Sequence, residues 1–171
     1  GVGALVVIGV VVFLIAGSGG SSKKSQSPAT ASTPSTTAET TGTTARGCNP
    51  ATSTTACPVH QINLISPAGR STVGIAEVLR KGSTTAIAIV AQGVPSNTTH
   101  NAYAVWLYNS AADALRLGFV NPGVGKNGRL QTAGGLPANA SRYKQLLVTL
   151  ESQANPRAPG QIVLEGPFAA G

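Results

Sequence analysis

The sequence predicts an all-β domain, a Greek-key β-sandwich of immunoglobulin-like type with about eight strands, preceded by a disordered stalk and one transmembrane helix. Three observations predict this organisation. From residue 58 to residue 171, short β-prone runs alternate with turn-forming Gly, Pro and Asn. Residues 18–57 are dominated by Ser, Thr, Ala and Pro. Residues 1–17 form one uncharged apolar run.

The first stretch, residues 1–17, reads GVGALVVIGVVVFLIAG and favours a membrane-spanning helix. At a rise of about 1.5 Å per residue it covers roughly 25 Å, slightly less than a hydrocarbon core of about 30 Å. A cleaved signal peptide is the second interpretation, because small residues at 16–19 follow the apolar core. Under both interpretations, the rest of the chain is exported from the cytoplasm.

The second stretch, residues 18–57, has hardly any large apolar side chain. It buries too little surface to offset the entropy of ordering, so we expect a disordered stalk. If about 30 of these residues behave as flexible coil, they reach roughly 30 Å, and as fully extended polyproline II about 90 Å. The stalk therefore tethers the domain while holding it clear of the bilayer.

Cys48 and Cys57 are the only cysteines. In an exported chain an even pair favours a disulfide, which in a loop of about ten residues contributes roughly 2 to 3 kcal/mol. Two cysteines with one nearby His60 are too few ligands for zinc, and the spacing is not C-x-x-C. The sequence therefore predicts a disulfide at the entrance to the domain and no metal.

The domain of residues 58–171 is organised around residues 102–108, which read AYAVWLY and contain the only tryptophan. Alternation places Tyr103, Val105 and Leu107 on one face, and Ala104, Trp106 and Tyr108 on the other. Both faces are apolar, which indicates a central strand. A polar turn and the run 115–120 complete a hairpin.

The other runs predict the remaining strands. The expected strands are 61–65, 72–79, 84–91, 102–108, 115–120, 128–132, 145–150 and 161–164, with a short helical turn at 138–144. The expected core residues are Val73, Ile75, Ile87, Ile89, Val105, Leu107, Leu117, Phe119, Leu147 and Ile162. We expect Trp106 to pack on a sheet face, and ligand stacking is its alternative role.

The charge is +7, with a pI near 10.0, but the 12 Lys and Arg residues are scattered and not interleaved with aromatic residues. This pattern argues against nucleic-acid binding. A G-x-G-x-x-G string at 123–128 lies between turn signals and a β-run, so we interpret it as a hairpin loop and not a nucleotide site.

Catalysis has few candidate residues. His60 and His100 belong to no recognisable catalytic motif, and the sequence has no G-x-S-x-G nucleophile elbow. A secreted hydrolase would need one of these histidines beside a serine and an acid. We therefore expect no enzyme, no cofactor and no catalytic site.

Several residues together resemble one protein family. They are Tyr103, Trp106, Leu107, Gly118, Phe119, Tyr143, Thr149, Glu151, Pro159 and Gly166. In this order they resemble the extracytoplasmic C-terminal domain of anti-sigma-K factors and related membrane-anchored anti-sigma factors, over about residues 62–168. The sequence departs from the family at Ser152, where proline usually follows the glutamate.

The resemblance implies a single-pass plasma-membrane protein whose C-terminal domain is extracytoplasmic. That domain would regulate transcription as a sensory domain, through protein contacts and regulated proteolysis. Its partners would be the membrane, through residues 1–17, and an envelope protein or a regulatory protease. A sigma factor would bind only a cytoplasmic part that nothing in these 171 residues matches. The alternative is a stalked cell-envelope binding module with no sigma-factor role.

Overall fold

The structure is a computed structural model that describes residues 48–169. The expected transmembrane helix at 1–17 and most of the expected stalk, residues 18–47, lie outside the described residues. Within residues 48–169, no helix has the length and apolar character needed to cross a membrane.

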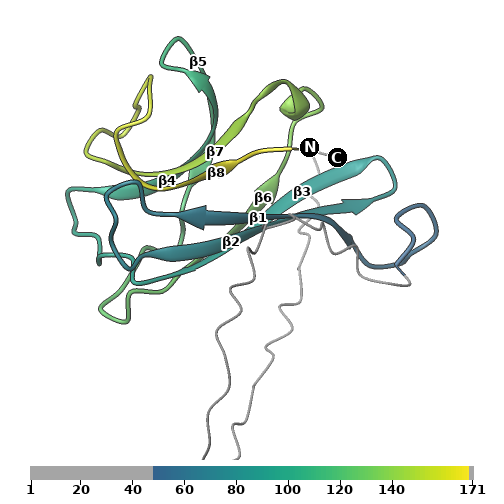
Figure 1. The fold of residues 1–171 in the computed structure, drawn as a ribbon, viewed down its shortest axis with the longest axis horizontal. Coiled ribbons are helices and arrows are strands. Elements are labelled where there is room, and N and C mark those ends of the chain that lie inside the picture. The colour runs from purple at the N-terminus through teal and green to yellow at the C-terminus, as the bar shows by residue number, and fades with distance from the viewer. Residues whose placement is uncertain (1–47, 170–171) are drawn as a thin grey trace, which may run out of the picture. The chain divides into compact units, whose positions relative to one another are not determined.

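Eight antiparallel strands form one nearly closed, barrel-like sheet (Figure 1). The strands are β1 (Cys57–Ile65), β2 (Val73–Lys81), β3 (Thr84–Gln92), β4 (Ala102–Ser110), β5 (Asp113–Phe119), β6 (Leu130–Gly135), β7 (Gln145–Glu151) and β8 (Gln161–Pro167). Their order in the sheet is β5-β4-β7-β8-β1-β2-β3-β6. The 3-10 turn η1 (Ala140–Arg142) falls inside the expected helical turn. The all-β class and the expected eight strands are confirmed.

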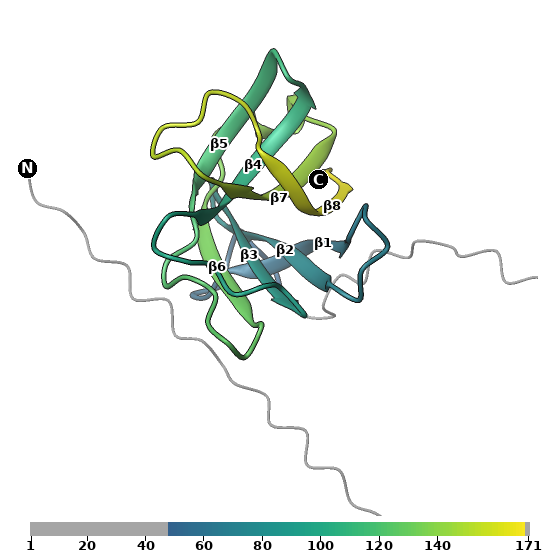
Figure 2. The ribbon, with the colours of Figure 1, turned by 90° about the vertical axis from the view of Figure 1, so that its left-hand side faces the viewer.

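The sheet consists of two four-stranded halves, which Figure 2 shows as an upper layer of β5, β4, β7 and β8 and a lower layer of β1, β2, β3 and β6. The halves are joined where β1 meets β8, at the single residue pair Ile65 and Glu165. The strands come very close here, since a Cβ on Gly166 would lie 2.5 Å from the carbonyl oxygen of Asn63. Only a glycine allows this approach without displacement of β1 or β8.

The main core lies on the inner faces of both halves. From β4, the side chains of Tyr103, Val105 and Leu107 enter it, whereas Ala104 and Trp106 lie on the opposite face, as alternation predicts. β4 is paired along both edges, to β5 and β7, which confirms it as a central strand.

The expected core is only partly correct. The buried members are Ile87, Ile89, Val105, Leu107 and Leu147, and the half-buried members are Leu117 and Ile162. The expectation is wrong for three others, because Val73, Ile75 and Phe119 are exposed.

The error in β2 has a clear physical cause. Both faces of this strand are apolar, so alternation alone does not choose between them. Pairing with β1 sets Ala76 opposite Ile62 and turns Ala76 and Val78 inward, where both are completely buried. Val73 and Ile75 then point outward.

The predicted disulfide between Cys48 and Cys57 is confirmed, with 5.6 Å between the two Cα atoms. Cys57 is fully buried and is the first residue of β1. The loop it closes is attached to the β2–β3 turn, because the amide of Gly82 donates a 2.8 Å hydrogen bond to the carbonyl of Pro50.

Candidate functional site

A second, smaller apolar cluster lies on the outer face of β4 and β7. Its buried members are Ala104, Trp106 and Leu147, and Trp106 is only 2% exposed. In the register of these strands, Trp106 pairs with Leu147, and the next position on the same face pairs Ala104 with Thr149. The small side chain of Ala104 leaves room for the indole to extend along the strand toward Thr149.

The indole nitrogen joins a buried hydrogen-bond network. Its N–H donates to Thr149 Oγ1 at 2.9 Å and to Glu151 Oε1 at 3.2 Å. The Thr149 hydroxyl and the Gly160 amide also donate to Glu151 Oε1, the latter at 2.9 Å. Glu151 is 4% exposed and one of its carboxylate oxygens has three donors, while Thr149 is fully buried. Such a network stabilises a buried charge because every donor is aimed at it.

Glu151 also lines a groove of about 550 Å³ between the start of β4 and the connection from β7 to β8. This connection is the olive-to-yellow loop of Figure 1. Asn101, Gln153, Arg157 and Gln161 share the lining. The second carboxylate oxygen, Oε2, accepts no hydrogen bond from the described residues, and a Cβ on Gly160 would lie 2.6 Å from it.

Arg116 of β5 covers the same outer face. Its guanidinium carbon lies 6.0 Å from the centroid of the Trp106 ring and 4.8 Å from that of Phe119. Its Nη1 is buried without a hydrogen-bond partner among residues 48–169. The two aromatic faces therefore hold this cation in place, and Phe119 is exposed because it packs under Arg116 rather than in the core.

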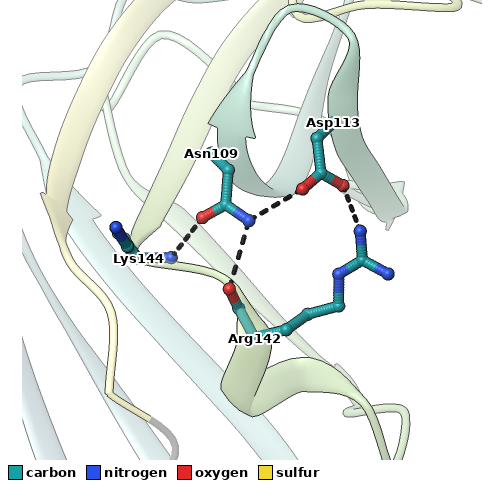
Figure 3. Close-up of polar contacts among 4 residues, drawn as sticks. All are labelled: Asn109, Asp113, Arg142 and Lys144. Atoms are coloured by element: carbon teal, nitrogen blue, oxygen red, sulfur yellow. Dashed lines mark hydrogen bonds and ion pairs between the residues drawn. The ribbon is translucent and has the colours of Figure 1, made fainter.

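A polar clamp at the opposite end of β4 consists of Asn109, Asp113, Arg142 and Lys144 (Figure 3). Asn109 Nδ2 donates to Asp113 Oδ2 at 2.9 Å and to the carbonyl of Arg142 at 3.1 Å. Its Oδ1 accepts from the Lys144 amide, and Arg142 pairs with Asp113 at 2.7 Å. The clamp fixes the β4–β5 turn to the start of β7, which is a structural role.

The other residues that carry the resemblance lie on the same half of the sheet. Tyr103 faces the main core and its hydroxyl donates to the carbonyl of Pro95 at 2.8 Å. Burial raises the pKa of Tyr103 above 10.0, and nearby Arg70 partly opposes this. Leu107 is fully buried on the same face, and Gly118 pairs with Val105.

The two histidines lie on different elements. His60 is in β1, paired with Val78, and His100 is exposed in the connection from β3 to β4. Sequence reasoning did not identify Gly160, because its contact with Glu151 depends on how the connection from β7 to β8 folds back. It did not identify Asn101 either, because that residue joins the groove from the separate connection between β3 and β4. The pattern of β5 did place Arg116 opposite the apolar face, but it indicated no aromatic partners.

Four large apolar side chains are exposed on the outer face of the lower half, and we call them the apolar strip: Ile65, Val73, Ile75 and Val90. They belong to three adjacent strands, β1, β2 and β3, and form the cross-strand pairs Ile65–Val73 and Ile75–Val90. Ile65 is 59% exposed and Val73 56%. The strip is therefore a continuous surface rather than a set of isolated residues.

These features can make two kinds of contact. Glu151 can accept a hydrogen bond or an ion pair in the groove, and the apolar strip can bury surface against another molecule. Within residues 48–169, no three His, Cys, Asp or Glu side chains are grouped to hold a metal ion. Comparison of the chain with protein families, with curated proteins and with solved structures finds no match.

Proposed function

We propose that residues 58–171 form the extracytoplasmic sensory domain of a single-span, anti-sigma-factor-like regulator of transcription. The domain acts through protein contacts and regulated proteolysis, without catalysis, and residues 1–17 anchor it in the membrane. The observation that carries the contact role is the apolar strip. The partner that covers the strip is a membrane-associated protein with an apolar surface of its own, either the regulatory protease or an envelope protein.

The strip supports this role because its exposure is built into the sheet. Strand alternation turns Val73 and Ile75 outward while Ala76 and Val78 fill the core. Contiguous exposed apolar surface is costly in water and is typical of an interaction site. Strand faces are also rigid, so a partner would bind without ordering a loop.

The residues that carry the resemblance also support the proposal. Trp106, Thr149 and Glu151 belong to a single network, and Gly166 permits the contact between the halves. Proteins that share these residues because of these structural roles would share the fold. We further propose that the sheet is a Greek-key sandwich. If β5 and β6 are taken as neighbours, four consecutive strands lie in the order β7-β4-β5-β6. The last of the four, β7, then returns to lie beside the first, β4, which is the Greek-key arrangement.

A stalked cell-envelope binding module is the second candidate. The observation that favours it is the excess of basic residues, with 12 Lys and Arg against 5 Asp and Glu. Two of the acids are engaged within the domain, because Glu151 is buried and Asp113 pairs with Arg142. The surface charge would attract an anionic envelope polymer.

The two candidates are tested with a photo-crosslinking residue at Ile75 of the protein in its own cells. The matched control carries the same residue at Ala112, an exposed turn position on the other half of the sheet. A regulator predicts a crosslink to a membrane protease or envelope protein from position 75 alone. It also predicts that Ile75→Glu changes transcription of one sigma-factor regulon.

The remaining outcomes are equally decisive. A specific crosslink with unchanged transcription favours the envelope module. Equal labelling from both positions, or none, overturns the contact role of the strip. The coding sequence upstream of Gly1 separates the candidates independently, because a helical domain with paired Cys and His supports the regulator and a short basic tail supports the module.

A further inference from the structure

We propose that the groove beside Glu151 binds the zwitterionic form of an amino acid or short peptide, with the ligand ammonium on Glu151 Oε2. This inference rests on the proposed recognition role and gives it a chemical class of ligand. It is carried by one carboxylate whose two oxygens have very different surroundings, on a residue that lines a groove of about 550 Å³.

The first step concerns the unused oxygen. Glu151 Oε1 receives three donors, from Trp106, Thr149 and Gly160, whereas Oε2 receives none from the described residues. An ionised carboxylate accepts at both oxygens, and no donor of the described residues uses the lone pairs of Oε2, which are left for a ligand or solvent. An ammonium group, with three donors and a positive charge, is the complementary ligand.

The second step concerns how firmly that oxygen is held. The donors to Oε1 come from β4, β7 and the β7–β8 connection, so the carboxylate cannot rotate freely. At Gly160 a Cβ would lie 2.6 Å from Oε2 and 2.9 Å from the carbonyl of Leu150. Position 160 therefore has no room for a side chain, and the glycine backbone packs directly beside Oε2. An acceptor fixed in advance binds a ligand with little loss of entropy.

The third step concerns the other side chains of the groove. Arg157 supplies a positive charge on the same lining, and Asn101, Gln153 and Gln161 supply amides. A simple amine would be repelled by Arg157, and a simple carboxylate by Glu151. A molecule with an ammonium and a carboxylate satisfies both, and the amides suit peptide groups. The groove volume lies within the range of about 300–1,000 Å³ typical of small-molecule sites.

Trp106 provides a direct reporter because it is the only tryptophan of the chain. Its indole N–H donates to Glu151 Oε1, so the indole NMR signal responds to a charge placed on Oε2. We would titrate the ¹⁵N-labelled full chain with glycylglycine. We expect a saturable shift of the indole signal, with binding weaker by about tenfold or more for N-acetylglycylglycine and for glycylglycinamide.

Variants assign the binding to the groove. Glu151→Gln should weaken glycylglycine binding about tenfold or more, and Arg157→Gln several-fold. The matched control, Glu77→Gln, removes an exposed carboxylate of β2 outside the groove and should change nothing. Arg157 is also exposed, so its variant should fold normally even if Glu151→Gln does not.

Three results would overturn the inference: no saturable shift up to about 50 mM glycylglycine, equal binding of the acetylated peptide, or equal weakening by Glu77→Gln. None of these results bears on the contact role of the apolar strip. If crosslinking from Ile75 persists but no peptide binds, the peptide-binding inference is wrong and the proposed function stands. Loss of that crosslink would contradict the proposed function alone.

Discussion

The indole nitrogen of Trp106 lies 3.2 Å from the carboxylate of Glu151, although the two residues are 45 positions apart in the sequence. Trp106 pairs with Leu147 and Glu151 with Ala102, so the indole extends along its strand to reach the carboxylate. Glu151 thereby accepts a hydrogen bond from a donor on the neighbouring strand. The contact joins the outer apolar cluster to the groove.

Replacing Trp106 with phenylalanine should destabilise the domain. The change removes the N–H that Thr149 and Glu151 accept and leaves their buried oxygens short of a donor, which costs about 1–3 kcal/mol. The smaller ring adds a cavity on the same face. Urea unfolding followed by far-UV circular dichroism measures the loss.

The control for this change is Tyr108→Phe. Tyr108 packs against the same cluster, but its hydroxyl makes no hydrogen bond within residues 48–169. Its removal should change the free energy of unfolding by less than about 0.5 kcal/mol. If both variants lose the same stability, the Trp106 network contributes nothing beyond packing.

The ionisation of Tyr103 should make stability fall at alkaline pH. Burial raises its pKa above 10.0 in the folded protein, with Arg70 opposing. The folded state therefore holds the proton more tightly than the unfolded state. This stability is fully present below the unfolded pKa of about 10 and is lost as pH rises through the folded value.

Comparison with Tyr103→Phe isolates this effect. The variant loses the hydrogen bond to Pro95, which costs about 0.5–1.5 kcal/mol at neutral pH. Above about pH 10 the urea midpoint of the natural protein should fall further than that of the variant. Parallel curves would show that Tyr103 keeps an ordinary pKa.

The fold was largely predictable from sequence because the strands alternate and are separated by turn residues. The two faces of β4 follow from its pattern, and Trp106 lies on the face opposite Tyr103. The orientation of β2 was not predictable, because register with β1, not hydrophobicity, decides which apolar face is buried. The role of Gly160 was not predictable either, since it depends on how the β7–β8 connection folds back.

The orientation of β2 is open to a direct test with two isoleucines. Ile75→Ala on the apolar strip should change the free energy of unfolding by less than about 0.5 kcal/mol, because the side chain is 45% exposed. Ile89→Ala, on β3 and almost fully buried, should cost about 2–5 kcal/mol. Chemical denaturation of both variants measures the difference. The opposite ranking would mean that β2 presents its other face to the core.

The junction between the halves should be sensitive to any side chain at Gly166. A Cβ there would lie 2.5 Å from the carbonyl of Asn63 and 2.9 Å from Leu64 Cδ2, so β8 would be pushed away from β1. Overpacking of this kind costs about 1–3 kcal/mol. We expect Gly166→Ala to lower the melting temperature.

The matched control is Gly134→Ala on β6, where an added Cβ meets nothing within 4 Å. Alanine there should be neutral, or stabilising by about 0.5–1 kcal/mol, because glycine loses more backbone entropy on folding. Hydrogen exchange locates the damage: Gly166→Ala should speed exchange of the Ile65 and Glu165 amides, the one residue pair that joins β1 to β8. Slow exchange at both amides in that variant would mean that the halves are held together by their shared core, because the strand contact would then be dispensable.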